Sequence, residues 1–164
     1  MPQASLKLVS RSAQETQRLG EIIGELCRAG DVILLSGVLG TGKTCLTQGI
    51  ARGLGIAESI TSPTFVLMRE FAGRLPLYHV DLYRLEFKEI GDLGLDEYLY
   101  GHGVCVIEWA EKGMALLPAE HLLIKLDYLG ENGRNIEVVP SSPRYRRMLS
   151  DIVSSLRPAR GEKA

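Results

Sequence analysis

Hydrophobic and polar residues follow two different periods along the first part of the chain. Residues 5–10 alternate with a period of two, which predicts a short strand. Ser12 followed by Glu15 is a capping-box pattern and predicts a helix that runs from there to about residue 28. Its apolar residues recur at helical spacing, at Leu19, Ile22, Ile23 and Leu26. The apolar run 31–37 is too short for a helix, so it predicts a buried strand of the parallel type.

Two pairs of predicted strands have turn residues between them and therefore indicate β-hairpins. The first pair is 65–71 and 75–85, around a turn that contains glycine. The second pair is 121–129 and 134–140, across a turn with the dipeptide Asn132-Gly133. Antiparallel pairs next to buried parallel strands predict a mixed sheet.

The rest of the chain predicts helices and one further buried strand. Residues 43–55 have a helical pattern, and residues 86–101 form two short helical patches broken at glycines. Residues 103–110 predict a second buried strand, with the acid Glu108 near its end. Ser142-Pro143 is an N-cap followed by proline, which predicts a last helix to about residue 156.

Size and composition fit one compact domain. The 164 residues are 45% hydrophobic and 24% charged, enough for a core but not for a second domain. We expect a single domain over 1–157 and a disordered polar tail over 158–164. A net charge of -1 excludes a global basic field, so we expect no DNA binding and any nucleic acid to be handled through a partner.

Cysteine usage and hydropathy predict a protein of a reducing compartment. Cys27, Cys45 and Cys105 are odd in number, far apart and without a C-x-x-C pair, which argues against disulfides and a zinc site. No apolar run approaches the roughly 18 residues of a spanning helix, and the first residues have no secretory h-region. The expected location is therefore the cytoplasm, without a membrane partner.

The strongest chemical signal is a complete phosphate-loop motif, G-x-x-x-x-G-K-[ST], from Gly37 to Thr44. It follows a predicted strand and opens a predicted helix, where backbone N–H groups can surround phosphate oxygens. Gly40 and Gly42 allow close approach of the backbone, Lys43 can reach the phosphates, and the Thr44 hydroxyl can ligate Mg²⁺. A chance match to the whole motif is expected in fewer than about one in a hundred chains of this length. The alternative is a glycine-rich strand-to-helix turn with a solvated lysine.

Two carboxylates are candidates for the metal and the reaction. Glu108 follows the apolar run Val104–Ile107 of the predicted strand 103–110, where nucleotide hydrolases need an acid near the metal; the alternative is a surface acid at the strand end. Trp109, the sole tryptophan, can stack on a base or anchor a partner, or pack in the core. Asp81 lies in the alternating stretch 78–85 and shares a face with His79 and Tyr83. His79 can orient Asp81, although a lone histidine in a strand is more often a core residue.

The segment around Thr61, Ser62 and Thr64 lies where GTPases have a switch loop, and its hydroxyls can sense a phosphate or Mg²⁺. The alternative is a Ser-Pro turn before a strand. The guanine motif N-K-x-D is absent, which weakens a GTPase interpretation. A small-molecule kinase usually needs clustered arginines in a lid, but those between 60 and 140 are scattered, at Arg69, Arg74, Arg84 and Arg134.

Taken together, these motifs resemble the TsaE family, formerly YjeE, over nearly all of residues 12 to 140. Each motif beyond the phosphate loop is modest, but their order and spacing are specific. The matching stretches are Leu39–Thr44, Ser62–Phe65, Tyr78–Arg84, Glu89 with Gly94–Glu97, Ile107–Trp109 and Leu116–Pro118.

The resemblance implies an α/β P-loop NTPase fold, a three-layer sandwich with a mixed parallel/antiparallel sheet. It also implies a bacterial ATPase that uses ATP and Mg²⁺ to make threonylcarbamoyladenosine in tRNA. In that family the protein binds a complex of TsaD, which transfers the threonylcarbamoyl group, and TsaB, and ATP hydrolysis supports turnover of the complex. Contact with tRNA is expected only indirectly, through these partners.

The resemblance also assigns residues. It implies that Leu39, Gly40, Thr41, Gly42, Lys43 and Thr44 hold the phosphates and that Thr44 and Glu108 bind Mg²⁺. Asp81 and Trp109 belong to its catalytic or coupling set, Arg134 lies beside the nucleotide, and the helix start near Ala13 is close. 

The chain departs from the family in two places. Cys45 replaces a common threonine and can make the site sensitive to oxidation or simply pack between helices. The basic segment with Arg144, Arg146 and Arg147 matches no family motif and can touch tRNA or a partner, or be a solvated helix face.

Two other functions remain as alternatives. The protein can be a nucleotide-dependent assembly module whose slow hydrolysis is incidental, or a small-molecule P-loop kinase.

Overall fold

The structure, a computed structural model, describes residues 5–38, 40–60 and 68–156. The predicted tail 158–164 lies outside the described residues, as do Leu39, Thr61, Ser62 and Thr64. Within the described part, seven strands form one sheet in the order β1-β7-β6-β2-β5-β4-β3. The strands are β1 Leu6–Ser10, β2 Val32–Ser36, β3 Met68–Phe71, β4 Leu77–Asp81, β5 Val104–Glu108, β6 Leu122–Leu129 and β7 Gly133–Pro140. The helices are α1 Ala13–Leu26, α2 Lys43–Gly53, α3 Phe87–Gly91, α4 Asp96–Leu99 and α5 Pro143–Leu156, with 3-10 turns η1 Ala110–Lys112 and η2 Met114–Leu116.

The sheet is mixed, as predicted. Strands β6, β2, β5 and β4 run parallel to one another at its centre, in that order. The hairpin β3–β4 adds an antiparallel edge on one side, and β7 and β1 add two antiparallel strands on the other. Both predicted hairpins are confirmed over the described residues. Residues 65–67 of the first predicted arm lie outside them, and residues 130–132 join β6 to β7.

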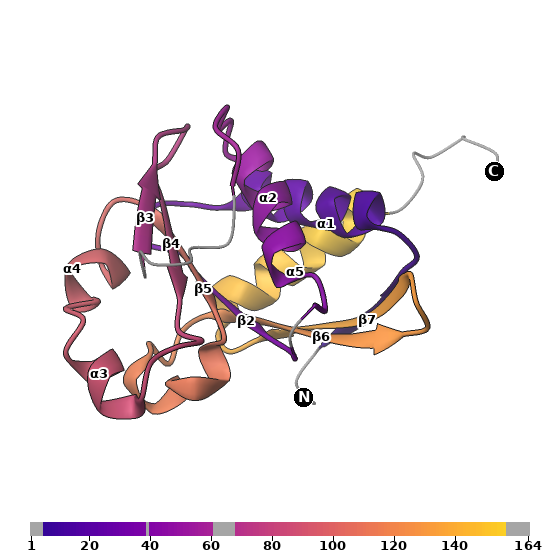
Figure 1. Cartoon of the computed structure of the whole chain (residues 1–164). Helices are drawn as coiled ribbons and strands as arrows, with labels where there is room; N and C mark the ends of the chain where they lie inside the picture. Colours follow the sequence, from indigo (N-terminus) through magenta and orange to yellow (C-terminus); the bar gives the residue numbers. More distant parts are fainter. Residues whose placement is uncertain (1–4, 39, 61–67, 157–164) are drawn as a thin grey trace, which may run out of the picture.

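Helices cover the sheet in layers (Figure 1). Helices α1, α2 and α5 pack on one face over a core that includes Ile33 and Leu35 of β2. The alternate residues of the same strand, Val32 and Leu34, belong to a second core with α3, α4 and the 3-10 turns on the opposite face. Because both faces of β2 are buried, its sequence is continuously apolar rather than alternating. The three-layer α/β sandwich is thus confirmed.

The predicted strand 75–85 is shorter in the structure than the pattern indicated. Strand β4 ends at Asp81, whose Oδ1 accepts a hydrogen bond from the Tyr83 N–H at 2.9 Å. This contact turns the chain, since an aspartate side chain competes with the sheet for nearby backbone N–H groups. The prediction that Tyr83 continues the strand face of His79 and Asp81 is therefore wrong.

The end of helix α1 also differs from the prediction. Helix α1 begins as predicted, with the Ser12 hydroxyl accepting the Glu15 N–H, but it ends at Leu26 rather than at residue 28. The Arg28 N–H donates to the Asp31 carboxylate at 2.7 Å, which holds the chain in a turn. Arg144 of α5 also donates to Asp31, at 2.7 Å, so this arginine is tied to the core of the fold rather than to a free basic face.

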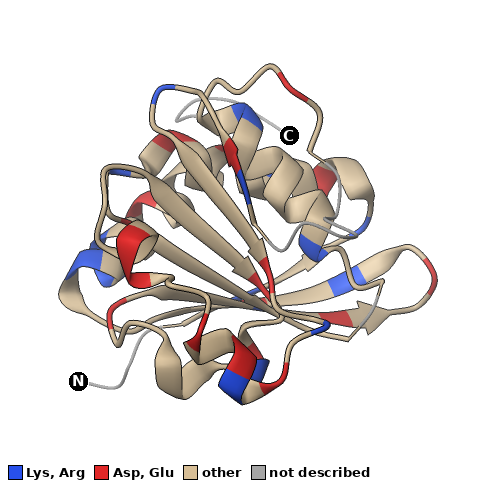
Figure 2. Cartoon of the chain, turned by 60° about the vertical axis from the view of Figure 1, so that its left-hand side comes forward, with Lys and Arg blue, Asp and Glu red and all other residues tan. Residues whose placement is uncertain are grey.

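In the cartoon of Figure 2, positions of Lys and Arg are interspersed along the chain with positions of Asp and Glu. Cys27 and Cys105 are buried and Cys45 is half-buried, and all three are free. Within the described ranges, no helix is both long and apolar enough to cross a membrane.

A close backbone contact joins α1 to α2. Gly20 and Gly24 on α1 face Gly49 and Gly53 on α2, and a Cβ atom on any of them would overlap backbone atoms of the other helix. At Gly24 the obstacle is the Ile50 carbonyl oxygen. Only glycine permits this approach, which holds the start of α1 beside the start of α2.

We expect Gly24→Ala to lower the free energy of unfolding by about 1–3 kcal/mol, because the added methyl group forces two helix backbones apart. Urea unfolding followed by circular dichroism measures the change. Gly91→Ala is the matched control: its Cβ would lie 3.8 Å from Leu116, an ordinary contact, so its stability should stay within about 0.5 kcal/mol of wild type. Equal stability of the two variants would contradict the packing argument.

Candidate functional site

The candidate site lies where the parallel strands end. Strand β2 leads into the phosphate loop, and α2 begins at Lys43 directly after it. In the sheet register, Glu108 of β5 pairs with Leu35 of β2 on one side and with Asp81 of β4 on the other. The two acids chosen from the sequence therefore lie at one level beside the loop, the position where open α/β sheets bind ligands.

The loop has the backbone shape that phosphate binding requires. Gly37, Gly40 and Gly42 have φ values of 144°, 82° and 103°, which favour glycine strongly. The buried Thr41 donates its hydroxyl to the Val38 carbonyl at 2.8 Å and so fixes the curve of the loop. No side chain caps the first turn of α2, which leaves its N–H groups for an anion. 

Lys43 lies over the mouth of the loop. Its ammonium donates to the carbonyls of Gly37 and, at 3.0 Å, of Val38. It also lies 4.0 Å from the centre of the Trp109 ring, a cation–π contact. Burial lowers the pKa of Lys43 below its ordinary value, while nearby carboxylates, Glu111 first, oppose that shift. A phosphate would give this cation a better partner than neutral carbonyls.

Thr44 and Glu108 form a hydroxyl–carboxylate pair. The Thr44 hydroxyl donates to Glu108 Oε1 at 3.1 Å, and Oε2 is 3.4 Å away. Glu108 is 2% exposed, and His79 Nε2 hydrogen-bonds to its Oε2. The pair borders a cavity of about 230 Å³, with the loop glycines, Lys43 and Trp109 on its other sides.

This pair suits Mg²⁺. Among the described residues, no three His, Cys, Asp or Glu side chains gather as metal ligands. Mg²⁺ needs no such cage, because it is usually held by one or two carboxylates, waters and the phosphates of its substrate. The convergence of a threonine hydroxyl and a buried carboxylate beside a phosphate loop therefore fits the ion.

Asp81 bonds to the backbone of Tyr83, and the Tyr83 ring packs against Trp109. Asp81 is 8% exposed and accepts the backbone N–H of Tyr83, whose ring is exposed and lies 4.7 Å from that of Trp109. Trp109 has a φ of 59°, the sole positive value at a non-glycine position in the described part of the chain. Its half-buried ring also touches the second core, so it both packs and borders the site. Such a strained backbone is common at functional sites.

Arg134 supports the loop from β7. Its Nε donates to the Thr41 carbonyl at 3.1 Å and its Nη2 to the Gly40 carbonyl at 3.2 Å, while its guanidinium lies 4.9 Å from the Tyr128 ring. The arginine chosen from the sequence thus touches the phosphate loop directly. Its contacts are with two loop carbonyls, which hold the loop against β7.

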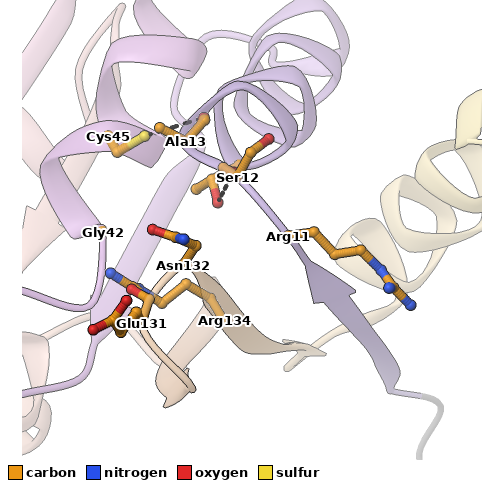
Figure 3. A pocket seen from close by; sticks show the side chains of 9 residues that line it. Arg11, Ser12, Ala13, Gly42, Cys45, Glu131, Asn132 and Arg134 are labelled. Atoms are coloured by element: carbon orange, nitrogen blue, oxygen red, sulfur yellow. Dashed lines mark hydrogen bonds between the residues drawn. The ribbon is translucent and has the colours of Figure 1, made fainter.

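A second cavity, of about 400 Å³, lies next to the loop and shares Gly42 and Cys45 with the first. Figure 3 shows residues of the β6–β7 turn facing the start of α1, whereas the Arg11 side chain points away from them. The residues that line this second cavity are Arg11, Ser12, Ala13, Thr16, Gly42, Cys45, Glu131, Asn132 and Arg134. Of these, the phosphate-loop motif had given Gly42, the family resemblance had given Ala13 and Arg134, and Cys45 had been considered beside the loop; the others were missed.

The structure separates the two interpretations of Cys45 and adds a residue, Glu111, that the sequence did not indicate. Cys45 Sγ donates to the Ala13 carbonyl at 3.3 Å, and burial raises the pKa of this thiol, which makes the reactive thiolate scarcer. The helix-packing alternative for Cys45 is thus the better one. The Glu111 carboxylate accepts the Gly37 N–H at 3.1 Å. No motif marks Glu111, because the contact depends on how the turn after Trp109 folds back to the loop.

Comparison with known proteins gives one consistent family. A sequence model of the family "Threonylcarbamoyl adenosine biosynthesis protein TsaE" matches residues 10–136. A protein of Treponema pallidum named tRNA threonylcarbamoyladenosine biosynthesis protein TsaE is 48% identical over 134 residues, covering 81% of this chain and 99% of that protein. A Bacillus subtilis protein of the same name is 41% identical over 148 residues, covering 90% and 93%.

A solved structure agrees. The crystal structure of Bacillus subtilis YdiB superposes with a TM-score of 0.82 at 35% sequence identity, covering 96% of this chain and 99% of that chain. The family model spans the loop and the ends of β4 and β5, and the fold match covers nearly all of the chain.

We expect Arg134→Ala to weaken binding of a fluorescent ATP analogue by about tenfold or more, since two charge-assisted hydrogen bonds to the loop are lost. Arg134→Lys keeps the charge but lacks the planar guanidinium, so its affinity for the analogue should lie between those of the wild type and Arg134→Ala. Fluorescence titration measures the affinity, with Arg147→Ala, an exposed arginine on α5, as the charge-matched control. Wild-type affinity in Arg134→Ala would contradict a supporting role.

Proposed function

Because the chain belongs to the TsaE family of threonylcarbamoyl adenosine biosynthesis proteins, we propose that it binds ATP with Mg²⁺ and hydrolyses it in support of tRNA modification. The observation that carries the proposal is the pairing of Thr44 with the buried Glu108 beside the phosphate loop. A glycine-rich turn of purely structural role would have no reason to bury a carboxylate at that place.

In this proposal the two adjoining cavities take the two parts of the nucleotide. The cavity of about 230 Å³ at Lys43 and Glu108 takes the phosphates with the metal. The cavity of about 400 Å³ between the start of α1 and Arg134 takes the nucleoside. Lys43 exchanges its carbonyl partners for phosphate oxygens, and the loop N–H groups with the first turn of α2 hold the remaining charge.

Thr44 and Glu108 would hold the metal, whose charge offsets the negative charge of the phosphates during hydrolysis. Asp81 lies beside Glu108 in the register and is the second carboxylate that can orient the attacking water. Its position is set by the turn to Tyr83. Trp109 closes the site next to Lys43 and connects it, through Tyr83, to the protein surface.

We further propose that the partners are the TsaD and TsaB proteins and that tRNA is reached through them, in the cytoplasm. The net charge of -1 and the mixed charges in Figure 2 favour a protein partner over direct contact with nucleic acid. The exposed Tyr83 ring next to Trp109 is a suitable contact for such a partner.

A small-molecule kinase is less well supported. Its arginine lid would require several guanidinium groups at the phosphates. Arg74 instead donates to the Gly24 carbonyl at 2.8 Å near the end of α1, and Arg69 lies over the Phe71 ring. Arg134 does contact the phosphate loop, but through the carbonyl groups of the loop. The assembly-module alternative differs only in whether hydrolysis is needed.

We expect Glu108→Ala and Asp81→Ala to bind ATP and the TsaD–TsaB complex but to lower ATP hydrolysis by about 100-fold or more, because charge stabilisation and water orientation are lost. The measurements are phosphate release and threonylcarbamoyladenosine formed in tRNA over several turnovers, with and without the two partners. The wild-type protein should support many turnovers of tRNA modification, and each variant should support at most one.

The same experiment separates the alternatives. Full multiple-turnover modification by either variant would favour the assembly module over the ATPase. Phosphate transfer to a metabolite in the absence of partners would favour the kinase. Asp92→Ala is the control for loss of a carboxylate away from the site, since Asp92 is exposed at the end of α3.

A further inference from the structure

His79 is a fully buried histidine in contact with the candidate metal ligand. It lies on β4, two residues before Asp81, and its side chain is 0% exposed. Its Nε2 hydrogen-bonds to Glu108 Oε2 across the β4–β5 pair. The sequence had suggested Asp81 as its partner, whereas Asp81 bonds to the Tyr83 backbone.

We propose that His79 is a positioning residue that sets the orientation of the Glu108 carboxylate for Mg²⁺; this rests on the proposed function. His79 holds Oε2 of Glu108, and the Thr44 hydroxyl lies closer to Oε1, at 3.1 Å, than to Oε2, at 3.4 Å. With Oε2 held, the carboxylate cannot rotate freely about its terminal bond. Oε1 therefore stays on the side of Thr44, the other proposed ligand.

The contact of His79 with Glu108 is made through one ring nitrogen. A carboxylate accepts hydrogen bonds, so Nε2 is the nitrogen that donates to Glu108. Nδ1 is buried without a hydrogen-bond partner among the described residues. The Nε2 contact is therefore the hydrogen bond by which the imidazole orients Glu108.

A purely structural role explains His79 less well. Its neighbour in the register with β5 is Val106, which belongs to the core under α1, α2 and α5. An apolar side chain at position 79 would pack in that core without burying polar atoms. The histidine makes sense where Glu108, itself 2% exposed, needs a donor. Partners of this kind behind a metal ligand typically fix its orientation and are worth about 10–100-fold in metal affinity.

The test compares His79→Gln with His79→Asn in the full-length protein. The amide nitrogen of glutamine can reach the position of Nε2, whereas asparagine carries the same amide one methylene short of it. The probe is a non-hydrolysable ATP analogue, titrated with and without Mg²⁺, with the fluorescence of Trp109, the sole tryptophan, as readout. His121→Asn is the control, since His121 bonds to the Pro118 carbonyl.

We expect His79→Asn to lower the apparent Mg²⁺ affinity by about 10–100-fold, with little change in analogue binding in EDTA. His79→Gln should recover most of the loss. In a Glu108→Gln background, His79→Asn should cause no further loss, because the two residues act through one interaction. Thermal unfolding of each variant verifies that it is folded at the assay temperature.

Three outcomes would overturn the inference while leaving the proposed function in place. They are wild-type Mg²⁺ dependence in a folded His79→Asn variant, an equal loss with and without Mg²⁺, and an undiminished loss in the Glu108→Gln background. If His79→Asn does not fold, wild-type-like Mg²⁺ dependence of His79→Gln supports the inference, and a loss equal to that of Glu108→Gln overturns it. A wild-type protein whose analogue binding ignores Mg²⁺ would instead overturn the proposed function itself.

Discussion

The parallel register of β2, β5 and β4 is the constraint on which the rest of the structure depends. It places Leu35, Glu108 and Asp81 side by side at the level where the phosphate loop begins. Because side chains alternate between faces, a shift of β5 by one residue would turn Glu108 to the opposite face of the sheet and away from Thr44. The register therefore determines the core and the candidate site at the same time.

The contact between α1 and α2 determines the second half of the site. Four glycines allow the two backbones to touch, which brings the start of α1 beside the start of the P-loop helix. The β6–β7 turn reaches the same place and contributes Arg134, whose hydrogen bonds hold the loop carbonyls. The larger cavity is thus formed by three segments that are far apart in the sequence. Helix packing and the β6–β7 turn therefore shape this cavity together.

Much of the fold and part of the site could be predicted, and particular residues show the limit. Periodicity predicted the seven strands and both hairpins of the described part, and the phosphate-loop motif led to Thr44 and Glu108, which do meet. Tyr83 was placed on the wrong element, because the Asp81 side chain ends the strand by a local hydrogen bond that alternation does not reveal. His79 was matched to its neighbour in sequence, although its partner is on the next strand.

The sequence by itself determined the elements, the phosphate loop and the family, because these depend on local periodicity and on short motifs. Only the tertiary structure decided which polar groups share a partner. The contacts of His79 with Glu108, of Glu111 with Gly37 and of Arg134 with the loop each join residues 29 to 94 positions apart. Such contacts follow from strand order and helix packing, since a buried carboxylate or a loop carbonyl bonds to whichever donor the fold brings within reach.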